Sequence, residues 1–341
     1  MLPALADLLA TARVVSLPLR GRFRGIIERE LLLFEGPLGC TEWSPFTEYE
    51  TAEAATWLRA AIEFGFGAVE RGAQAPMVRT RIPVNATLAA VTPAEVETVL
   101  ERFGKFETVK IKVAESGQCL SDDLARIRRV HELYPNAKLR LDANGGWRVA
   151  EVLAVAGALS EAGFNLDYLE QPVASLTEMI ELRERLDQMG LATVRLAADE
   201  LVRKAEDPLA IARTGAVDVL VLKVQPLGGV AAALDLAEAA KAASPRQLSF
   251  AVSSAIESSV GISMGLALAG ALPELEHDCG LATVHVLAAD VTDEPLEAKD
   301  GFLDVRRVAV SSSKLQKYAA NPERTEWWLR RLEACYRELE G

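Results

Sequence analysis

Hydrophobic and polar positions alternate in the stretch 108–113, where three apolar residues are interleaved with a threonine and two lysines. Strict alternation of this kind predicts a β-strand. Side chains two residues apart lie on the same face of a strand, so Lys110 and Lys112 are expected to hold their ammonium groups close together.

From about residue 82 onward, apolar strand-like runs alternate with helical stretches rich in alanine and leucine. Eight units at this spacing predict an α/β protein with a parallel (β/α)₈ TIM-like barrel. No Gly-x-Gly-x-x-Gly motif opens the first unit, which argues against a dinucleotide-binding fold. The strand-like runs begin near Ile82, Thr108, Leu139, Tyr168, Val194, Val217, Leu248 and Leu275. The helical stretches are 93–103, 121–133, 149–162, 176–189, 208–214, 229–243 and 257–269.

The two ends of the chain follow different patterns. Near the start, we expect strands at 13–17 and 28–34 and a helix over 52–64, which together make a small α+β unit. After about residue 285, a strand at 301–305 and a helix at 321–340 are predicted to pack against that first unit. The predicted division is a capping domain (1–81), a barrel (82–284) and a C-terminal segment (285–341).

Composition and charge exclude several classes of protein. The 341 residues are half hydrophobic and a quarter charged, with a formal net charge of −12, which argues against binding to nucleic acid or an anionic membrane. The four cysteines are widely spaced and predict neither a disulfide framework nor a zinc site. The first residues lack the basic region of a signal peptide, and no apolar run approaches a membrane span. We therefore expect a cytoplasmic protein with a small-molecule partner, of an oligomeric state that the sequence does not reveal.

Three acidic residues end neighbouring strand-like runs. Asp142, Glu170 and Asp199 close the third, fourth and fifth runs, and the carboxyl ends of barrel strands form the active face of such folds. Buried carboxylates cost several kcal/mol each unless they are neutralised. Three carboxylates with room for water or substrate suit Mg²⁺, and Mn²⁺ accepts the same donors.

Lysines flank these acids on both sides, with Lys110 and Lys112 on the second run and Lys223 on the sixth. A metal that binds a substrate carboxylate acidifies the neighbouring carbon by stabilising an enediolate. A lysine whose pKa is lowered by nearby cations is then a suitable base. A metal-free ion network of the three lysines and three acids is the alternative interpretation, but six charges in this strand order favour a functional site.

The pattern alone leaves the tasks of two further polar residues open. Arg140 shares a strand face with Asp142 and Asn144, and either orients the first acid or forms a plain salt bridge. Glu200 follows Asp199 directly, so the two-residue period does not decide which of the two points into the barrel.

These motifs resemble the muconate-lactonizing subgroup of the enolase superfamily. The resemblance rests on Lys110-x-Lys112, Asp142-Ala-Asn144, Glu170-Gln-Pro172, Asp199-Glu200 and Lys223. It implies an N-terminal α+β capping domain, completed by the C-terminal tail, over a modified (β/α)₈ barrel. It also implies Mg²⁺ held by Asp142, Glu170 and Asp199.

Within that superfamily, the stretches 42–49, 82–87 and 253–261 are similar to o-succinylbenzoate synthases. This resemblance implies a carbon–oxygen lyase of menaquinone biosynthesis, which converts 2-succinyl-6-hydroxy-2,4-cyclohexadiene-1-carboxylate to o-succinylbenzoate by syn-dehydration. Lys112 would be the base and then the acid, Lys223 would stabilise the enediolate through a cation–π contact, and Lys110 would polarise the carboxylate.

The substrate-binding residues and the reaction leave alternatives open. Ser253 and Ser254 hold the succinyl carboxylate or cap the following helix, and Arg22, in the loop 20–25, closes over the site or lies on a basic surface loop. Asn144 is a further candidate for binding substrate. The same lysines would serve an N-acylamino acid racemase, with bases on opposite faces of one carbon, and a barrel that binds a ligand without catalysis is the third reading.

Overall fold

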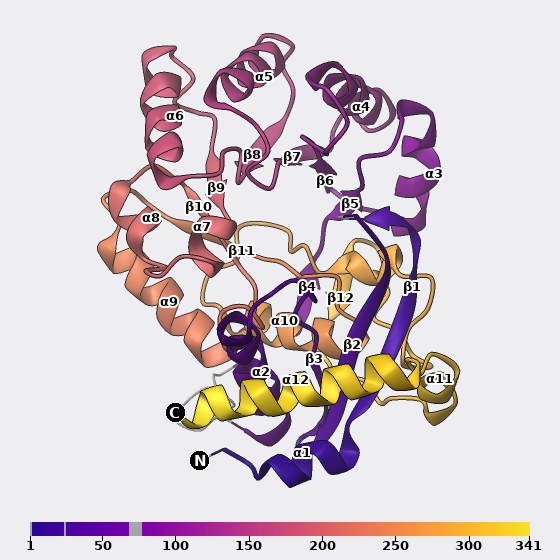
Figure 1. Cartoon of the computed structure of the whole chain (residues 1–341). Helices are drawn as coiled ribbons and strands as arrows, with labels where there is room; N and C mark the ends of the chain where they lie inside the picture. The colour runs from indigo at the N-terminus through magenta and orange to yellow at the C-terminus, as the bar shows by residue number, and fades with distance from the viewer. Residues whose placement is uncertain (1, 24, 68–76) are drawn as a thin grey trace.

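The computed structural model describes residues 2–23, 25–67 and 77–341. A three-stranded antiparallel sheet in the order β1-β2-β3 forms the N-terminal part, and a parallel sheet curls into the barrel beside it (Figure 1). No helix in these ranges is long and apolar enough to cross a membrane.

The N-terminal sheet is built on a long hairpin. Strands β1 (Arg13–Phe23) and β2 (Ile26–Gly36) pair antiparallel, and β3 (Gly39–Trp43) adds to β2 after a tight turn. Most of the expected loop at 20–25 therefore belongs to the end of β1. The pairing of β1 with β2 changes register between Pro18 and Phe23 and resumes where Phe23 is opposite Ile26. The sheet is flanked by α1 (Leu5–Thr11) and α2 (Thr51–Phe66); α1 and β3 were not predicted because each is too short to show a clear period.

Among the residues that the structure describes, seven parallel strands form the barrel wall, in the order β11-β10-β9-β8-β7-β6-β5. This order, with each strand beside its neighbour in sequence, confirms the parallel TIM-like barrel. The strands are β5 (Ala86–Leu88), β6 (Thr108–Lys112), β7 (Lys138–Asp142), β8 (Leu166–Glu170), β9 (Leu196–Ala198), β10 (Val219–Leu222) and β11 (Ser249–Val252).

The prediction of eight regular strands was wrong at the first and last runs. The run at Ile82 splits, because β4 (Arg81–Pro83) pairs antiparallel with β12 (Phe302–Asp304) and only β5 joins the wall. The run at Leu275 makes isolated parallel bridges, Cys279 with Val84 and Gly280 with Ser253, instead of a strand in the described chain. Proline and acidic residues in 273–278 disfavour a regular strand there.

Helices lie around the outside of the parallel strands, as Figure 1 shows for α3 to α6 and α9. The predicted helix at 93–103 is divided into η2 (Pro93–Glu95), α3 (Val96–Leu100) and η3 (Glu101–Phe103). The other barrel helices are α4 (Leu120–Leu133), α5 (Val149–Glu161), α6 (Leu176–Gln188), α7 (Glu200–Arg203), α8 (Ala210–Thr214), α9 (Val230–Ala243) and α10 (Ser259–Ala271).

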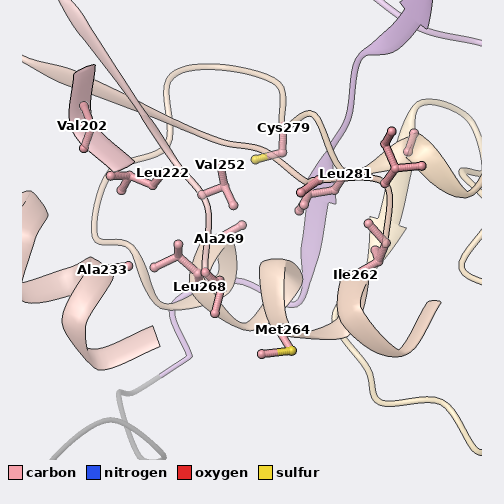
Figure 2. Packing of buried hydrophobic residues seen from close by; sticks show 14 of the residues in the cluster. Val202, Leu222, Ala233, Val252, Ile262, Met264, Leu268, Ala269, Cys279 and Leu281 are labelled. Carbon is pink, nitrogen blue, oxygen red and sulfur yellow. The ribbon is translucent and has the colours of Figure 1, made fainter. Parts of the chain in front are cut away.

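Helix α10 is almost entirely buried, since it lies between the barrel and the N-terminal sheet. Its residues Ile262, Met264 and Leu268 are all buried, and Figure 2 shows Met264 on the other side of the helix from Val252 of β11 and Leu281. An apolar helix of this kind cannot be assigned an exposed face by periodicity, since both of its sides are in the core.

The C-terminal helix α12 (Pro322–Glu340) crosses the N-terminal sheet (Figure 1). Trp328 stacks edge-on against Trp43 of β3 at 5.3 Å between ring centroids, and its Nε1 donates to Glu30 at 2.9 Å. Arg331 donates to the backbone oxygens of Phe46 and Tyr49. The division of the chain at residues 81 and 284 stays a prediction.

Glu42 of β3 joins the N-terminal sheet to the start of α10. Its carboxylate accepts hydrogen bonds from the Ser44 hydroxyl at 2.7 Å, from the Ser258 backbone at 3.1 Å and from the Gly261 backbone at 3.1 Å. The side chain is completely buried. Burial, together with the nearby Glu257 carboxylate, raises the pKa of Glu42 to about 7.

We predict that Glu42 makes the fold less stable as pH rises. Its pKa is about 4.5 when unperturbed and about 7 in the fold, so its contribution is fully present below the lower value and is lost as pH rises through the higher one. The total change is at most about 3 kcal/mol. Urea unfolding at pH 5 and pH 8 should show a smaller fall in stability for Glu42→Gln than for wild type. Glu338→Gln, on the exposed face of α12, is the control, and a variant that keeps the full wild-type pH dependence would contradict the prediction.

Candidate active site

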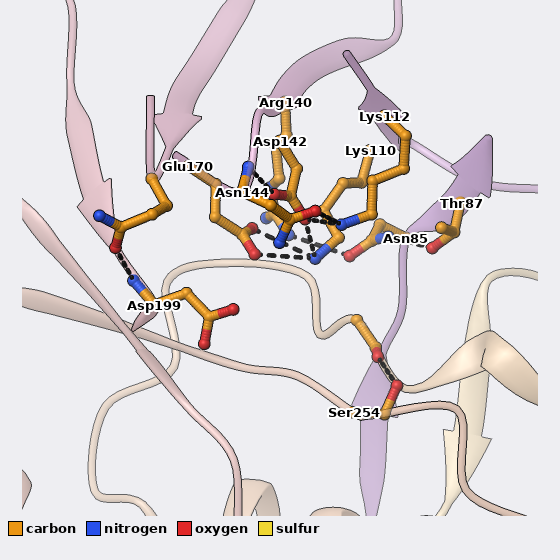
Figure 3. A network of polar contacts seen from close by, with 12 residues as sticks. Asn85, Thr87, Lys110, Lys112, Arg140, Asp142, Asn144, Glu170, Asp199 and Ser254 are labelled. Carbon is orange, nitrogen blue, oxygen red and sulfur yellow. Dashed lines mark hydrogen bonds and ion pairs between the residues drawn. The ribbon is translucent and has the colours of Figure 1, made fainter. Parts of the chain in front are cut away.

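Adjacent strands place five of the predicted charged residues at the same end of the barrel. In the parallel register, Lys112 at the end of β6 is opposite Asp142 at the end of β7, which in turn is opposite Glu170 at the end of β8. Asp199 directly follows β9, and Lys223 directly follows β10. Figure 3 shows Asp142 and Glu170 pointing toward Lys110 and Lys112, with Asp199 below them in this view.

The two lysines of β6 share one carboxylate. Lys112 Nζ lies 2.5 Å from Asp142 Oδ2, and Lys110 Nζ lies 3.3 Å from the same atom. Lys110 also contacts Glu170 Oε1 at 3.0 Å. The predicted alternation therefore does bring both ammonium groups to one face of the strand.

On the other side, Asp199 is held by two cations. Lys223 Nζ lies 2.6 Å from its Oδ2, and Arg203 Nε lies 3.0 Å from its Oδ1. Arg203 Nη1 also donates to the hydroxyl oxygen of Tyr49 at 3.1 Å, which brings a residue of the N-terminal part to the site. Sequence reasoning missed Arg203 and Tyr49, although the four-residue spacing of Arg203 from Asp199 in a helical turn was an available signal.

The residues that follow two of the acids bend the backbone sharply and crosslink the strand ends. Gln171 (φ 36°) and Asn144 (φ 46°) both occupy the left-handed region. The Gln171 side-chain oxygen accepts from the backbone N–H of Asp199 at 3.1 Å and of Leu201 at 3.1 Å. Asn144 accepts from Lys112 Nζ at 2.7 Å, which links it to the same charged cluster.

Burial and mutual charge shift the pKa values of the cluster in different directions. Burial and the neighbouring Asp142 raise the pKa of Glu170 to about 7. Although burial opposes it, the ammonium groups of Lys112 and Lys110 hold the pKa of Asp142 well below its usual range, and Lys223 and Arg203 do the same for Asp199.

The two lysines of β6 also differ. Burial lowers the pKa of Lys112, and the positive charge of Lys110 lowers it further. These two effects outweigh the contact with Asp142, which acts in the opposite direction. Burial also acts against the charged form of Lys110, but the carboxylates of Glu170 and Asp142 outweigh it and raise its pKa. Lys112 is thus the amine of this pair that loses its proton more readily.

The donor set fits a divalent cation in its chemistry. Glu170 keeps a raised pKa even beside Lys110, so its carboxylate is short of positive charge. Glu200 accepts from Asn144 and Arg203 through Oε1, while its buried Oε2 has no hydrogen-bond partner in the described chain. As the side chains lie, no group of three or more His, Cys, Asp or Glu among the described residues is arranged to hold a metal.

Arg140 lies deeper in the barrel than the acids, and its bonds go elsewhere. Its guanidinium donates to Asp167 at 2.8 Å, to the Asn85 side chain at 3.0 Å and to the Asp278 backbone at 2.6 Å. It also lies over the Tyr168 ring, 4.6 Å from the centroid. These contacts favour the salt-bridge alternative over the orientation of Asp142.

Ser253 and Ser254 follow β11, and the structure favours a structural task for the Ser254 hydroxyl. That hydroxyl donates to the Gly280 backbone at 2.7 Å and contacts the Thr283 hydroxyl at 2.8 Å (Figure 3). The helix cap of α10 is Ser258 instead, whose side chain accepts from the Val260 backbone.

A cavity of about 710 Å³ opens beside Lys112 and Asn144. Arg22, Arg20 and Phe23 from the end of β1 line it on the side of the N-terminal sheet. Phe23 approaches Lys112 directly, with Nζ 6.0 Å from its ring centroid. The hairpin therefore forms a wall of the cavity next to the candidate base.

Known proteins share both the sequence and the architecture. Residues 92–309 match the family model of enolase C-terminal domain-like proteins, and residues 14–65 match that of enolase N-terminal domain-like proteins. O-succinylbenzoate synthases of Mycobacterium tuberculosis and Mycobacterium bovis are each 49% identical over 336 residues, covering 98% of this chain and 97% of theirs. The chain belongs to the o-succinylbenzoate synthase family of the enolase superfamily. Enzymes of this superfamily generally use Mg²⁺.

Solved structures of the superfamily share the fold. The muconate lactonizing enzyme of Pseudomonas putida superposes with a TM-score of 0.72 at 20% identity, covering 91% of this chain and 98% of that one. The enzyme of Pseudomonas fluorescens, complexed with muconolactone, gives a TM-score of 0.75 at 20% identity over the same shares. At this identity the likeness confirms the fold of a barrel with a capping domain.

We predict that Gln171→Met destabilises the fold strongly. Methionine has a similar volume but leaves the backbone N–H groups of Asp199 and Leu201 without their acceptor. Each unsatisfied buried donor costs about 1–3 kcal/mol, so the free energy of unfolding should fall by roughly 2–6 kcal/mol in urea titrations. Gln188→Met, at the exposed end of α6, is the control, and equal losses in both variants would rule out this role of Gln171.

Proposed function

We propose that the protein is an Mg²⁺-dependent o-succinylbenzoate synthase of menaquinone biosynthesis. It dehydrates 2-succinyl-6-hydroxy-2,4-cyclohexadiene-1-carboxylate to the aromatic product, as a carbon–oxygen lyase. The observation that carries the proposal is the meeting of Lys112, Lys223 and three carboxylates at one barrel end, in a chain 49% identical to curated synthases.

Asp142, Glu170 and Asp199 would hold the Mg²⁺ ion, since their carboxylate oxygens are the donors that this cation prefers. When bound, the ion supplies positive charge to the substrate carboxylate and so acidifies the carbon next to it. The surroundings of Glu170 support this assignment, because burial and the Asp142 carboxylate raise its pKa to about 7 despite the contact with Lys110, and a bound cation would act against both.

Lys112 is the proposed base and acid. Its lowered pKa favours the neutral amine that accepts the proton from the carbon next to the carboxylate. The electron pair left on that carbon then expels the hydroxyl group, which takes the same proton from the Lys112 ammonium and leaves as water. One residue acting in both steps, from one face of the ring, gives the syn stereochemistry.

Lys223 and Lys110 have electrostatic roles in the proposal. Lys223, across the cluster beside Asp199, would stabilise the negative charge that develops on the ring, through a cation–π contact. Lys110, which bridges Asp142 and Glu170, would polarise the substrate carboxylate and keep the amine of Lys112 neutral.

The cavity beside Lys112 supports a role for the cationic hairpin in binding the dicarboxylate substrate. Arg22 and Arg20 line it, and their positive charge suits a second, succinyl carboxylate. Ser253, buried and next to the end of β11, would contribute there through its backbone or hydroxyl, whereas the Ser254 hydroxyl already has two partners.

We predict that Lys112→Ala abolishes dehydration. The loss should be at least about 10²–10⁴-fold, the usual contribution of a positioned proton-transfer group, in a spectrophotometric assay of aromatisation. Wild type should lose activity in EDTA and regain it with Mg²⁺. Lys241→Ala, on the exposed side of α9, is the control; activity of Lys112→Ala within a few-fold of wild type would remove Lys112 from this role.

We also predict that Mg²⁺ binds at a single site per chain. Isothermal titration should show binding to wild type, and Glu170→Gln or Asp199→Asn should weaken it at least about tenfold. Asp235→Asn, on an exposed surface of α9, should bind like wild type. Absence of binding to wild type would favour the metal-free ion network instead.

A further inference from the structure

Helix α4, on the outside of the barrel, carries a buried ion pair close to the candidate base. Asp123 and Arg126 are each 1% exposed, and Arg126 Nη1 lies 3.0 Å from Asp123 Oδ1. Burying such a pair costs desolvation energy that the attraction between the charges barely offsets. A pair of this kind is therefore better explained by what it contacts than by added stability.

The guanidinium of Arg126 holds the backbone of Lys112. Nη1 donates to the Lys112 carbonyl at 2.9 Å, and Nε donates to the Val91 carbonyl at 2.7 Å. Nη2 donates to the side-chain oxygen of Gln118, whose own amide donates to Ala90 at 2.8 Å. Val91, Ala90 and Gln118 all line the cavity beside Lys112, so one planar cation joins the base to the cavity wall.

The sheet itself does not supply this restraint on that side. The pairing of β5 with β6 ends where Leu88 is opposite Ile111, one residue before Lys112. On the other side, the backbone N–H of Val113 still donates to the backbone carbonyl of Asp142 at 3.1 Å. Arg126 thus provides a donor for the Lys112 carbonyl at the point where the strand next to it stops.

The other oxygen of the ion pair holds the turn that follows. Asp123 Oδ2 accepts from the backbone N–H of Ala114 at 2.9 Å, and Ala114 has φ of 57°. The left-handed region is uncommon for a residue with a Cβ and costs about 1–3 kcal/mol, so it persists where the surroundings impose it. Gly146 packs against this turn so closely that an added Cβ would lie 2.8 Å from the Cβ of Ala114.

We propose that Asp123 and Arg126 are positioning residues for Lys112. Together they fix the backbone on both sides of Val113, and through it the point from which the Lys112 side chain reaches Asp142 and Asn144. Displacement of a reacting group by about 1 Å costs up to roughly a hundredfold in rate. The inference rests on the proposed function, because it assigns these residues to the proton transfer at Lys112.

The test compares Arg126→Met and Arg126→Lys with wild type, on substrate carrying hydrogen or deuterium at the carbon that loses its proton. We expect kcat to fall about tenfold to a hundredfold, with a smaller change in KM, and the isotope effect on kcat to increase. Lysine keeps the charge beside Asp123 but cannot span the acceptors that the planar fork reaches. It should therefore show the same shift in isotope effect with less loss of stability.

Arg183→Met is the matched control for a purely structural loss. Arg183 is also buried on a barrel helix and bonds the Ala216 carbonyl and the Asp218 carboxylate, at the opposite end of the strands. It should lower stability while leaving the isotope effect at the wild-type value. The positioning role is wrong if the Arg126 variants also keep the wild-type isotope effect and differ from wild type only in how much of the enzyme is folded.

A measurement without turnover separates this inference from the proposed function. The nitrogen chemical shift of the Lys112 ammonium group, assigned by NMR, should move in Arg126→Lys and stay unchanged in Arg183→Met. An unchanged shift in Arg126→Lys would overturn the positioning role whatever the reaction is. Wild-type enzyme that fails to dehydrate the cyclohexadiene substrate would instead contradict the proposed function.

Discussion

The mutual neutralisation of buried charges at one end of the barrel is the constraint on which the rest of the structure depends. Asp142, Glu170 and Asp199 are all at most 1% exposed, in surroundings where an unpaired charge is costly. Three ammonium groups reach them from β6 and from the end of β10. The compensation is incomplete at Glu170, whose pKa is raised to about 7. A cluster of this kind is poised to accept further positive charge and to hold one amine in its neutral form.

Positions of the charged groups are fixed by polar contacts outside the cluster as much as by the strands. Gln171 ties the end of β8 to the backbone of Asp199, and Arg126 ties the end of β6 to helix α4. The sharp turns at Ala114, Asn144 and Gln171 are left-handed at residues with a Cβ. Strain of this type is tolerated where neighbouring contacts over-determine the backbone, which is the case beside all three strand ends.

The N-terminal part is a component of the site and not only a cover for it. Tyr49 bonds Arg203 beside Asp199, and Phe23 faces Lys112 across the cavity. Glu42 anchors β3 at the start of α10. The fold alone does not define the chemistry, because muconate lactonizing enzymes at 20% identity share it. Residues of the N-terminal part therefore line the cavity beside Lys112 together with residues of the barrel.

The sequence alone predicted the parallel barrel and the six charged residues that lie near one end of its strands. The two-residue period of a strand put Lys110 and Lys112 on one face, and parallel strands with their ends in register brought the acids beside them. Both features follow from the geometry of the local backbone. The identity of the family came from motifs at these same positions.

Only the tertiary structure decided which partners those residues have. Arg140 donates hydrogen bonds to the side chains of Asp167 and Asn85. Arg126, which lies 14 residues after Lys112 in the chain, donates to the Lys112 carbonyl from helix α4. The last predicted strand of the barrel consists of isolated bridges at Cys279 and Gly280 in the described chain. Some of these contacts join residues that are distant in the chain, and others depend on which rotamer a long side chain adopts. The local periodicity of the sequence encodes neither of these.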